Sequence, residues 1–244
     1  MSINVNIDKK KLVREIASVI VLPNISQFPL NADIGYDNGW LKVRYTSTGY
    51  ARVDGRPNYH PYGLLVDLQY FTITATYYIK TLASQFGYYL NFLERSPGDA
   101  YVEYHGFYLD ASGRLEARAF PGSLTGTTSG TVNAGDIIIL GIGLGRYGGN
   151  YYFTYGACKY DWDTDACTQI INAYTDAIST PGTNVLYHAL LEQNASTGEV
   201  YVATFYRVDS SRMSSVPTAG IDSDTLILGV RMARKLGLAD PRTI

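Results

Sequence analysis

The sequence predicts a mainly β protein: an antiparallel β-sandwich or jelly roll of about ten strands, with N- and C-terminal helices and one inserted helix. Two observations predict this class. Residues 62–120 are a nearly unbroken series of Tyr, Phe, Thr, Val and Ile, residue types that favour strands. Short turns separate the strand-like segments, and such neighbours pair in an antiparallel sense. With 244 residues, the chain can bury a substantial core.

In the N-terminal arm, residues 1–22, the spacing of apolar residues predicts an amphipathic helix over residues 8–22 that ends before Pro23. Its apolar positions follow helical spacing and are Leu12, Val13, Ile16, Val19 and Ile20. The helix could cap the open end of the sandwich. In a second interpretation it is an assembly arm that reaches a neighbouring subunit, lipid or nucleic acid through its cations, which are Lys9, Lys10, Lys11 and Arg14.

The body of the chain, residues 23–221, alternates strand-like segments with polar loops. Strands are expected at 39–46, 64–74, 75–82, 88–94, 100–109, 114–120, 136–142, 151–155, 185–191 and 199–208. Residues 64–82 could instead form one long strand. The turn from Asp110 to Gly113 indicates a hairpin, because glycine readily adopts the positive φ that a tight turn needs.

Two further helices are expected. Residues 164–178 predict the inserted helix, whose apolar face would be Ile170, Ile171, Tyr174, Ala177 and Ile178. Residues 226–236 predict the final helix within the C-terminal basic region, 222–244, with Asp222 or Ser223 as its N-cap. Its cations lie near the C-terminal end, where they are favoured and could serve assembly, and are Arg231, Arg234 and Lys235.

The charge balance narrows the class of function. The net charge is −2, with 20 basic and 22 acidic residues, so no global field attracts nucleic acid. No long apolar run indicates a membrane span, and we expect no secretion signal. The motifs of P-loop enzymes, serine hydrolases and zinc proteases are absent. These observations exclude the common motif-bearing enzyme classes.

Three glycines, Gly143, Gly145 and Gly148, match the G-x-G-x-x-G pattern of dinucleotide-binding proteins. That pattern requires a helix next, so that the helix N-terminus meets the pyrophosphate. The following residues, 150–155, are instead typical of a strand. We therefore predict a glycine-rich hairpin.

Alternating carboxylates at Asp161, Asp163 and Asp165 resemble the start of a calcium-binding loop. The complete loop is absent, because Ala166 and Asn172 stand where glycine and glutamate are needed. A simple surface Ca²⁺ site is the only cofactor site that the sequence offers. The alternative is an acidic turn that leads into a helix, with the Asp side chains capping that helix.

The only two cysteines, Cys158 and Cys167, flank the same turn. A disulfide between them would stabilise the fold by roughly 2 to 3 kcal/mol. Two buried free thiols are the alternative. The three histidines, His60, His105 and His188, lack the spacing of zinc ligands.

Isolated glutamates offer the best case for catalysis. Glu103 with Glu116, or Glu199, could supply the two carboxylates of a β-sandwich glycosidase, with aromatic residues stacking on sugar rings. Isolated acidic residues on strands are more often the solvent-facing positions of an alternating pattern, so we expect no enzyme. Glycosylation sequons occur at Asn24 and Asn194, in expected loops.

The leading amphipathic arm, the β-dense Tyr- and Gly-rich body and the basic closing helix together resemble the jelly-roll coat proteins of icosahedral viruses, especially those of thermophilic archaea. The resemblance implies a self-assembling capsid subunit of the virion, made in the host cytoplasm, with no small-molecule substrate. Its partners would be further copies and other virion proteins, with inner-membrane or genome contact through the termini. The alternatives are a carbohydrate-binding or glycoside-hydrolysing lectin-like sandwich, and a spike, tail or filament subunit.

The tyrosines of residues 62–120 are too numerous for the core of such a sandwich, because each buried hydroxyl needs a hydrogen-bond partner. We therefore expect this stretch to supply both the central sheet and a Tyr-rich surface by which copies meet.

Overall fold

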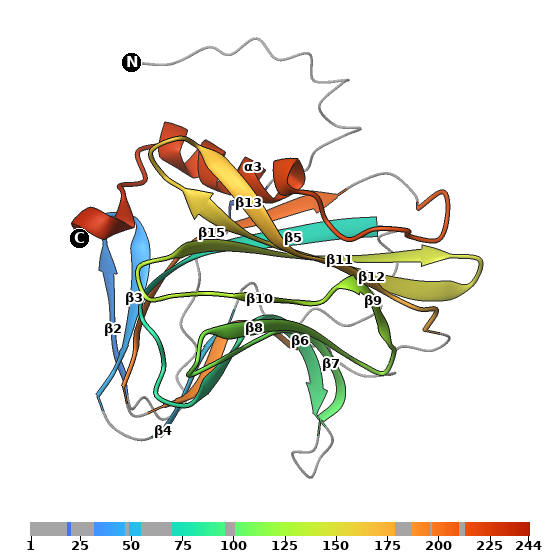
Figure 1. Ribbon diagram of the computed structural model, residues 1–244, viewed down its shortest axis with the longest axis horizontal. Helices are drawn as coiled ribbons and strands as arrows, with labels where there is room; N and C mark the ends of the chain where they lie inside the picture. The colour runs from blue at the N-terminus through green and yellow to red at the C-terminus, as the bar shows by residue number, and fades with distance from the viewer. Residues whose placement is uncertain are drawn as a thin grey trace.

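Over the residues that it describes, the computed structural model of the protein is an antiparallel β-sandwich with an α-helix packed on the outside of one sheet (Figure 1). The structure describes residues 19–20, 32–46, 49–54, 70–95, 101–178, 187–195, 197–209 and 213–244. This architecture confirms the fold class that the sequence predicts.

One layer is a nine-stranded sheet with the order β2-β3-β15-β5-β11-β12-β13-β9, in which β1 also pairs with β15. Its members are β1 (Val19–Ile20), β2 (Ala32–Asp37), β3 (Trp40–Tyr45), β5 (Tyr70–Thr81), β9 (Leu124–Thr127), β11 (Ile137–Tyr147), β12 (Asn150–Asp161), β13 (Ala166–Thr175) and β15 (Glu199–Asp209). All pairings are antiparallel.

The other layer is a six-stranded antiparallel sheet with the order β10-β8-β7-β6-β14-β4. Its members are β4 (Gly49–Asp54), β6 (Phe86–Arg95), β7 (Tyr101–Asp110), β8 (Arg114–Phe120), β10 (Ser129–Thr131) and β14 (Tyr187–Ala195). The expected hairpin joins β7 to β8, and Gly113 adopts a φ of +85° there.

The main core lies between the two sheets and follows the alternation of their strands. Tyr89, Phe107 and Leu115 of the six-stranded sheet are buried against residues such as Ile142 and Phe153. Alternate residues of each strand point to opposite faces, so the residues between these core positions face away from the core. One face of each sheet is thereby left for another element or for solvent.

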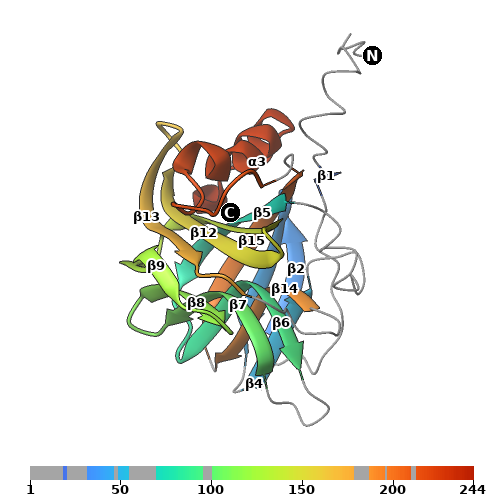
Figure 2. The same ribbon diagram turned by 90° about the vertical axis from the view of Figure 1, so that its right-hand side faces the viewer.

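The outer face of the nine-stranded sheet is covered by α3 (Ser223–Lys235) and a short 3₁₀ helix, η1 (Pro241–Thr243) (Figures 1 and 2). Asp222 caps α3, because its carboxylate accepts a hydrogen bond from the backbone N–H of Thr225 at 2.8 Å. A second core of buried residues lies beneath the helix and includes Trp40, Ile139, Trp162, Tyr201, Ile221, Leu226 and Val230. The helix predicted at 226–236 is therefore present and begins slightly earlier.

Paired glycines make room for this C-terminal segment. Gly141 and Gly156 lie opposite each other on β11 and β12. A Cβ atom at Gly141 would lie 2.5 Å from Leu226 Cδ2, and one at Gly156 would lie 2.5 Å from the carbonyl oxygen of Ile221. The absence of side chains here lets residues 221–226 approach the sheet closely.

The prediction of an inserted helix at 164–178 is wrong, because these residues contain β13, which pairs with β12 and β9. Ile171, Ala173 and Thr175 are buried at every second position, which is the period of a strand. The Ile170–Ile171 pair fits both periods, and pairing on both sides decides in favour of the strand.

The N-terminal helix is also wrong at its last turn, because Val19 and Ile20 form β1 and pair with Arg207 and Tyr206 of β15. The rest of the arm, with Lys9, Lys10, Lys11 and Arg14, lies outside the described residues, as does Asn24. Asn194 lies in β14 instead of a loop.

Two ambiguities of the sequence are settled. Residues 70–81 form one long strand, β5. Gly143 and Gly145 lie inside β11, and the turn to β12 contains Gly148 and Gly149, both with positive φ, as the predicted glycine-rich hairpin requires. Among the described helices, none has the length and apolarity to cross a membrane.

Candidate functional site

An aromatic surface occupies the outer face of the six-stranded sheet. On β7, Phe107 and Leu109 point into the core, so the alternate residues Tyr104 and Tyr108 point outward. The register with β6 places Tyr88 opposite Tyr108. Phe86 lies two residues before Tyr88 and therefore shares its face. We call Phe86, Tyr88, Tyr104 and Tyr108 the aromatic platform.

The rings of the platform contact one another in a continuous cluster. The ring centroids of Phe86 and Tyr108 lie 5.6 Å apart in a stacked arrangement, and those of Tyr88 and Tyr108 lie 5.4 Å apart. Tyr104 meets Tyr88 edge-to-face at 5.1 Å. Phe86, Tyr88 and Tyr108 are partly exposed, whereas Tyr104 is buried. Such contacts hold the rings in place, so the platform is preorganised.

A row of charged residues on β8 borders the platform. The Arg118 guanidinium lies 3.6 Å from the centroid of the Tyr108 ring, a close cation–π contact. Its Nε and Nη2 atoms both donate to Glu116 Oε2, at 3.3 and 3.0 Å. The other carboxylate oxygen of Glu116 lies 2.6 Å from Arg114 Nη2. We call Arg114, Glu116 and Arg118 the arginine row.

The arginine row is open to solvent. The side chains of Arg114 and Arg118 are 65% and 41% exposed, and that of Glu116 is 20% exposed. On its far side, the register places Ser129 opposite Glu116 and Thr131 opposite Arg114, and both residues are exposed. Hydroxyl groups therefore continue the surface beyond the charges.

Local strain lies beside the platform. Leu90 of β6 has a φ of +43°, in the left-handed region, at a register shift between β6 and β7. Its neighbour Asn91 is fully buried, and among the described residues its side-chain amide has no hydrogen-bond partner. A Cβ atom at Gly106 would lie 2.5 Å from Asn91 Cβ. Unpaired buried amides and strained backbone are more frequent at functional positions than elsewhere.

Two of the predicted glutamates lie on different sheets. Glu116 is part of the arginine row on the six-stranded sheet. Glu199 is on the other sheet, where Lys42 Nζ and Lys80 Nζ lie 3.2 and 3.5 Å from its Oε1 atom. Glu103 is a residue of β7 whose side chain is not described, so the predicted pairs that include it stay predictions.

Glu199 is held ionised. Burial disfavours its charge, but hydrogen bonds from Tyr201 and Lys42, together with the charges of Lys42 and Lys80, hold the pKa of the carboxyl below its ordinary value. A general acid needs a raised pKa, so this environment suits a structural ion pair.

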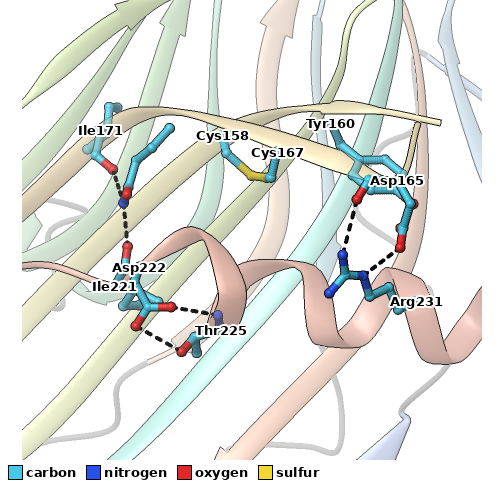
Figure 3. The surroundings of a disulfide bond; sticks show 10 residues. Cys158, Tyr160, Asp165, Cys167, Ile171, Ile221, Asp222, Thr225 and Arg231 are labelled. Atoms are coloured by element: carbon cyan, nitrogen blue, oxygen red, sulfur yellow. Dashed lines mark hydrogen bonds and ion pairs between the residues drawn. A yellow bond between two sulfur atoms is a disulfide. The ribbon is translucent and has the colours of Figure 1, made fainter. Parts of the chain in front are cut away.

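The three aspartates of the predicted calcium loop bind different partners, and Figure 3 shows Asp165 with Arg231. Asp161 accepts hydrogen bonds from the backbone N–H groups of Asp163 and Thr164. Asp163 binds the guanidinium of Arg242 through both oxygens, and Asp165 binds Arg231. Within the described part of the chain, no three His, Cys, Asp or Glu side chains form a group that could hold a metal ion. The carboxylates of this turn thus bind backbone N–H groups and arginines, and the turn leads into the strand β13 instead of the helix that the alternative interpretation expects.

Cys158 and Cys167 are joined by a disulfide, with their Cα atoms 5.7 Å apart (Figure 3). The bond links β12 to β13 beneath α3. It lies on the opposite side of the molecule from the aromatic platform.

Two of the three cations of the C-terminal helix, Arg231 and Arg234, bind residues of the same molecule. Arg231 Nε donates to Asp165 Oδ2 at 2.7 Å (Figure 3), and Arg234 hydrogen-bonds to the hydroxyl of Tyr160 and packs over the ring of Trp162. Lys235 is exposed. Arg231 and Arg234, expected to serve assembly, therefore anchor α3 to the β12–β13 hairpin.

The sequence predicts a Tyr-rich surface within residues 62–120 but does not specify which residues form the aromatic platform. The available signal was the alternation within β7 and β8, where Tyr104 and Tyr108 share one face, as do Arg114, Glu116 and Arg118. Which face remains open depends on where α3 packs, and strand patterns do not specify that.

Comparison with known proteins supports the fold. No family model and no curated protein sequence matches this chain. A protein of unknown function from Shewanella oneidensis MR-1 has a similar structure: the identity is 9%, the match covers 89% of this chain and all of that one, and the TM-score is 0.52. A likeness at this identity shows the fold alone.

Two weaker structural matches carry functional names. A Trypanosoma rangeli sialidase matches with 14% identity and a TM-score of 0.46, over 89% of this chain and 30% of the sialidase. The CBM2 module of the evolved Dit of Lactobacillus casei BL23 phage J-1 matches with 10% identity and a TM-score of 0.38, over 82% of this chain and all of the module. This chain thus spans about 30% of the length of the sialidase.

The expectation that the protein is not an enzyme is corrected by these matches, because they include sialidases, which are enzymes. The absence of a recognised catalytic motif in the sequence is no ground for excluding catalysis in a chain with this fold.

Proposed function

We propose that this protein is a lectin-like β-sandwich that binds carbohydrate on the outer face of its six-stranded sheet. The observation that carries the proposal is the aromatic platform, which lies on a sheet face that no described helix or strand covers, directly beside the arginine row. Small-ligand sites combine aromatic surface with a few placed polar groups, and this face has both.

The chemistry of the face suits sugars. Sugar rings have an apolar C–H side that can pack on partly exposed rings such as Phe86 and Tyr108. Their hydroxyls both donate and accept hydrogen bonds. Arg118 supplies donors, Glu116 supplies an acceptor, and the tyrosine hydroxyls supply both. The cation–π contact holds Arg118 in one orientation, which lowers the entropy lost on binding.

Titration calorimetry against a panel of soluble neutral and acidic glycans tests the proposal. We expect Tyr108→Ala to weaken binding at least about tenfold, because the variant removes the ring that contacts Phe86, Tyr88 and Arg118. The matched control is Tyr36→Ala, which removes a 58% exposed tyrosine from β2 of the other sheet. Equal losses in both variants, or no binding by the native protein, would refute the proposal.

The same glycans, incubated with the protein and assayed for new reducing ends, test for hydrolysis. Glu116→Gln is the informative variant, because Glu116 is the carboxylate at the platform. Glu199→Gln is its control on the other sheet, where the carboxylate is paired with Lys42 and Lys80.

Self-assembly as a coat, spike, tail or filament subunit stays a prediction. The feature that bears on it is an exposed apolar stripe on the outer side of α3, where Leu228, Met232 and Leu236 follow one another at helical spacing. Light scattering coupled to size-exclusion chromatography checks it, and a strict monomer at high concentration would remove this second candidate.

A further inference from the structure

The arginine row presents two exposed guanidinium groups beside the aromatic platform. Arg114 and Arg118 share the carboxylate of Glu116. Asp110, at the hairpin beside Arg114, is a second carboxylate, and its Oδ1 atom accepts hydrogen bonds from the N–H groups of Ser112 and Arg114 and from the Ser112 hydroxyl. The two arginines and the two carboxylates balance in charge, so the case for an anionic ligand rests on the open guanidinium donors.

The donors of the row are also incompletely used. A guanidinium has five N–H donors. In the described contacts, Arg118 binds Glu116 through Nε and Nη2, and Arg114 binds it through Nη2. The Nη1 groups of both arginines do not contact Glu116. Both side chains are exposed, so a ligand can reach these donors without unfolding any element.

We infer that the carbohydrate bound at this face carries a carboxylate, as in a uronic or sialic acid. This inference rests on the proposed function. A guanidinium binds a carboxylate with two parallel charge-assisted hydrogen bonds, which a neutral sugar hydroxyl cannot match. The ring of the same acidic sugar would pack on the partly exposed rings beside Arg118, those of Phe86 and Tyr88, since Arg118 itself lies over the Tyr108 ring at 3.6 Å. Glu116 lies between the two arginines along β8 and pairs with both. Ser129 and Thr131, on the neighbouring strand, could donate hydrogen bonds from their hydroxyls to the next sugar unit.

Matched pairs of glycans, differing only in the acidic group, test the inference by titration calorimetry. One pair is an oligogalacturonate and its carboxyl-reduced neutral form, and the other is sialyllactose and lactose. We expect the acidic member of one pair to bind at least about tenfold more tightly at low salt. The pair that shows the preference identifies the source of the carboxylate. High salt should weaken only the acidic member, because the arginines are exposed.

Two variants locate the effect. Arg118→Gln should abolish the acidic preference, because the affinity for the acidic member should fall by a larger factor than the affinity for the neutral member. Arg146→Gln is the matched control, because it removes an exposed arginine that also lies near a tyrosine ring, that of Tyr151, on the other sheet. We expect Arg146→Gln to retain the preference.

The experiments distinguish a failure of the inference from a failure of the proposed function. Tyr108-dependent binding with no acidic preference, or a preference that survives Arg118→Gln, would overturn the inference and leave carbohydrate binding standing. If Arg118→Gln weakened both members equally, the arginine would act only by holding Tyr108, and the inference would again be wrong. Absence of binding to both members and to the whole glycan panel would overturn the proposed function as well.

Discussion

The two sheets of the sandwich use their outer faces in opposite ways. On the nine-stranded sheet, α3 covers Trp40, Ile139 and Tyr201, and the charged groups around it pair within the molecule. On the six-stranded sheet, no described element covers the aromatic platform, and Arg114 remains 65% exposed. Both faces are rich in aromatic residues, so composition does not distinguish them.

Aromatic residues on the open face are better candidates for function than those under the helix. Aromatic rings under a helix contribute to stability through burial, and arginines there, such as Arg231 and Arg234, bind residues of the β12–β13 hairpin. Aromatic rings on an open face gain less burial from the fold, so the exposed part of these rings is available for contacts outside the protein. Variants on the two faces should therefore affect different measurements.

The largest effect expected on the covered face comes from Leu226→Ala. Leu226 is fully buried between α3 and the sheet, so the variant should lower the free energy of unfolding by about 2 to 5 kcal/mol. Urea unfolding followed by fluorescence measures this. The control is Leu228→Ala on the same helix, where the side chain is 41% exposed and the expected loss is below about 0.5 kcal/mol. Similar losses in both variants would contradict the packing described for α3.

Removing the disulfide should have a somewhat smaller effect. Cys158 and Cys167 are nine residues apart, and a loop of this length corresponds to roughly 2 to 3 kcal/mol. Cys158→Ala with Cys167→Ala should lower the urea midpoint accordingly and leave glycan affinity unchanged, since the bond lies on the covered face. A loss of binding that exceeds the loss of folded protein would show that the two faces are coupled.

The smallest effect concerns pH. Burial, followed by a hydrogen bond to Asp165, raises the pKa of Tyr160 to about 12. The folded state thus favours the neutral phenol, and this contribution to stability is complete below the unfolded pKa of about 10 and is lost as the pH rises toward 12. Unfolding by urea at pH 9 and pH 11.5 should show a larger decline for the native protein than for Tyr160→Phe. Equal declines in the two proteins would contradict a raised pKa of Tyr160 in the folded state.

Local features of the fold could be predicted from the sequence. The hairpin at Asp110–Gly113, the strand alternation of β8 and the final helix each depend on residues close together in the chain, and each is present. The strand β13 was predicted as a helix because its Ile170–Ile171 pair fits both periods, and only its pairing with β12 and β9 resolves the ambiguity.

The tyrosines were predicted only in part. Tyr88 and Tyr108 lie on an outer face as expected, whereas Tyr77, Tyr89 and Tyr155 are buried in the core. Tyr155 shows how the fold accommodates this, because its hydroxyl lies 3.0 Å from Nδ1 of the buried His105. Such pairs join residues on different sheets, and sequence patterns contain no information about them.

The position of β15 between β3 and β5 has a consequence for the newly made chain. β3 and β5 are both synthesised well before residues 199–209, the strand that each of them pairs with. At ribosomal rates this interval is on the order of ten seconds. During that time the emerging polypeptide has two open strand edges, which are surfaces prone to aggregation. The two edges of β3 and β5 therefore become paired only when β15, the last strand, is made.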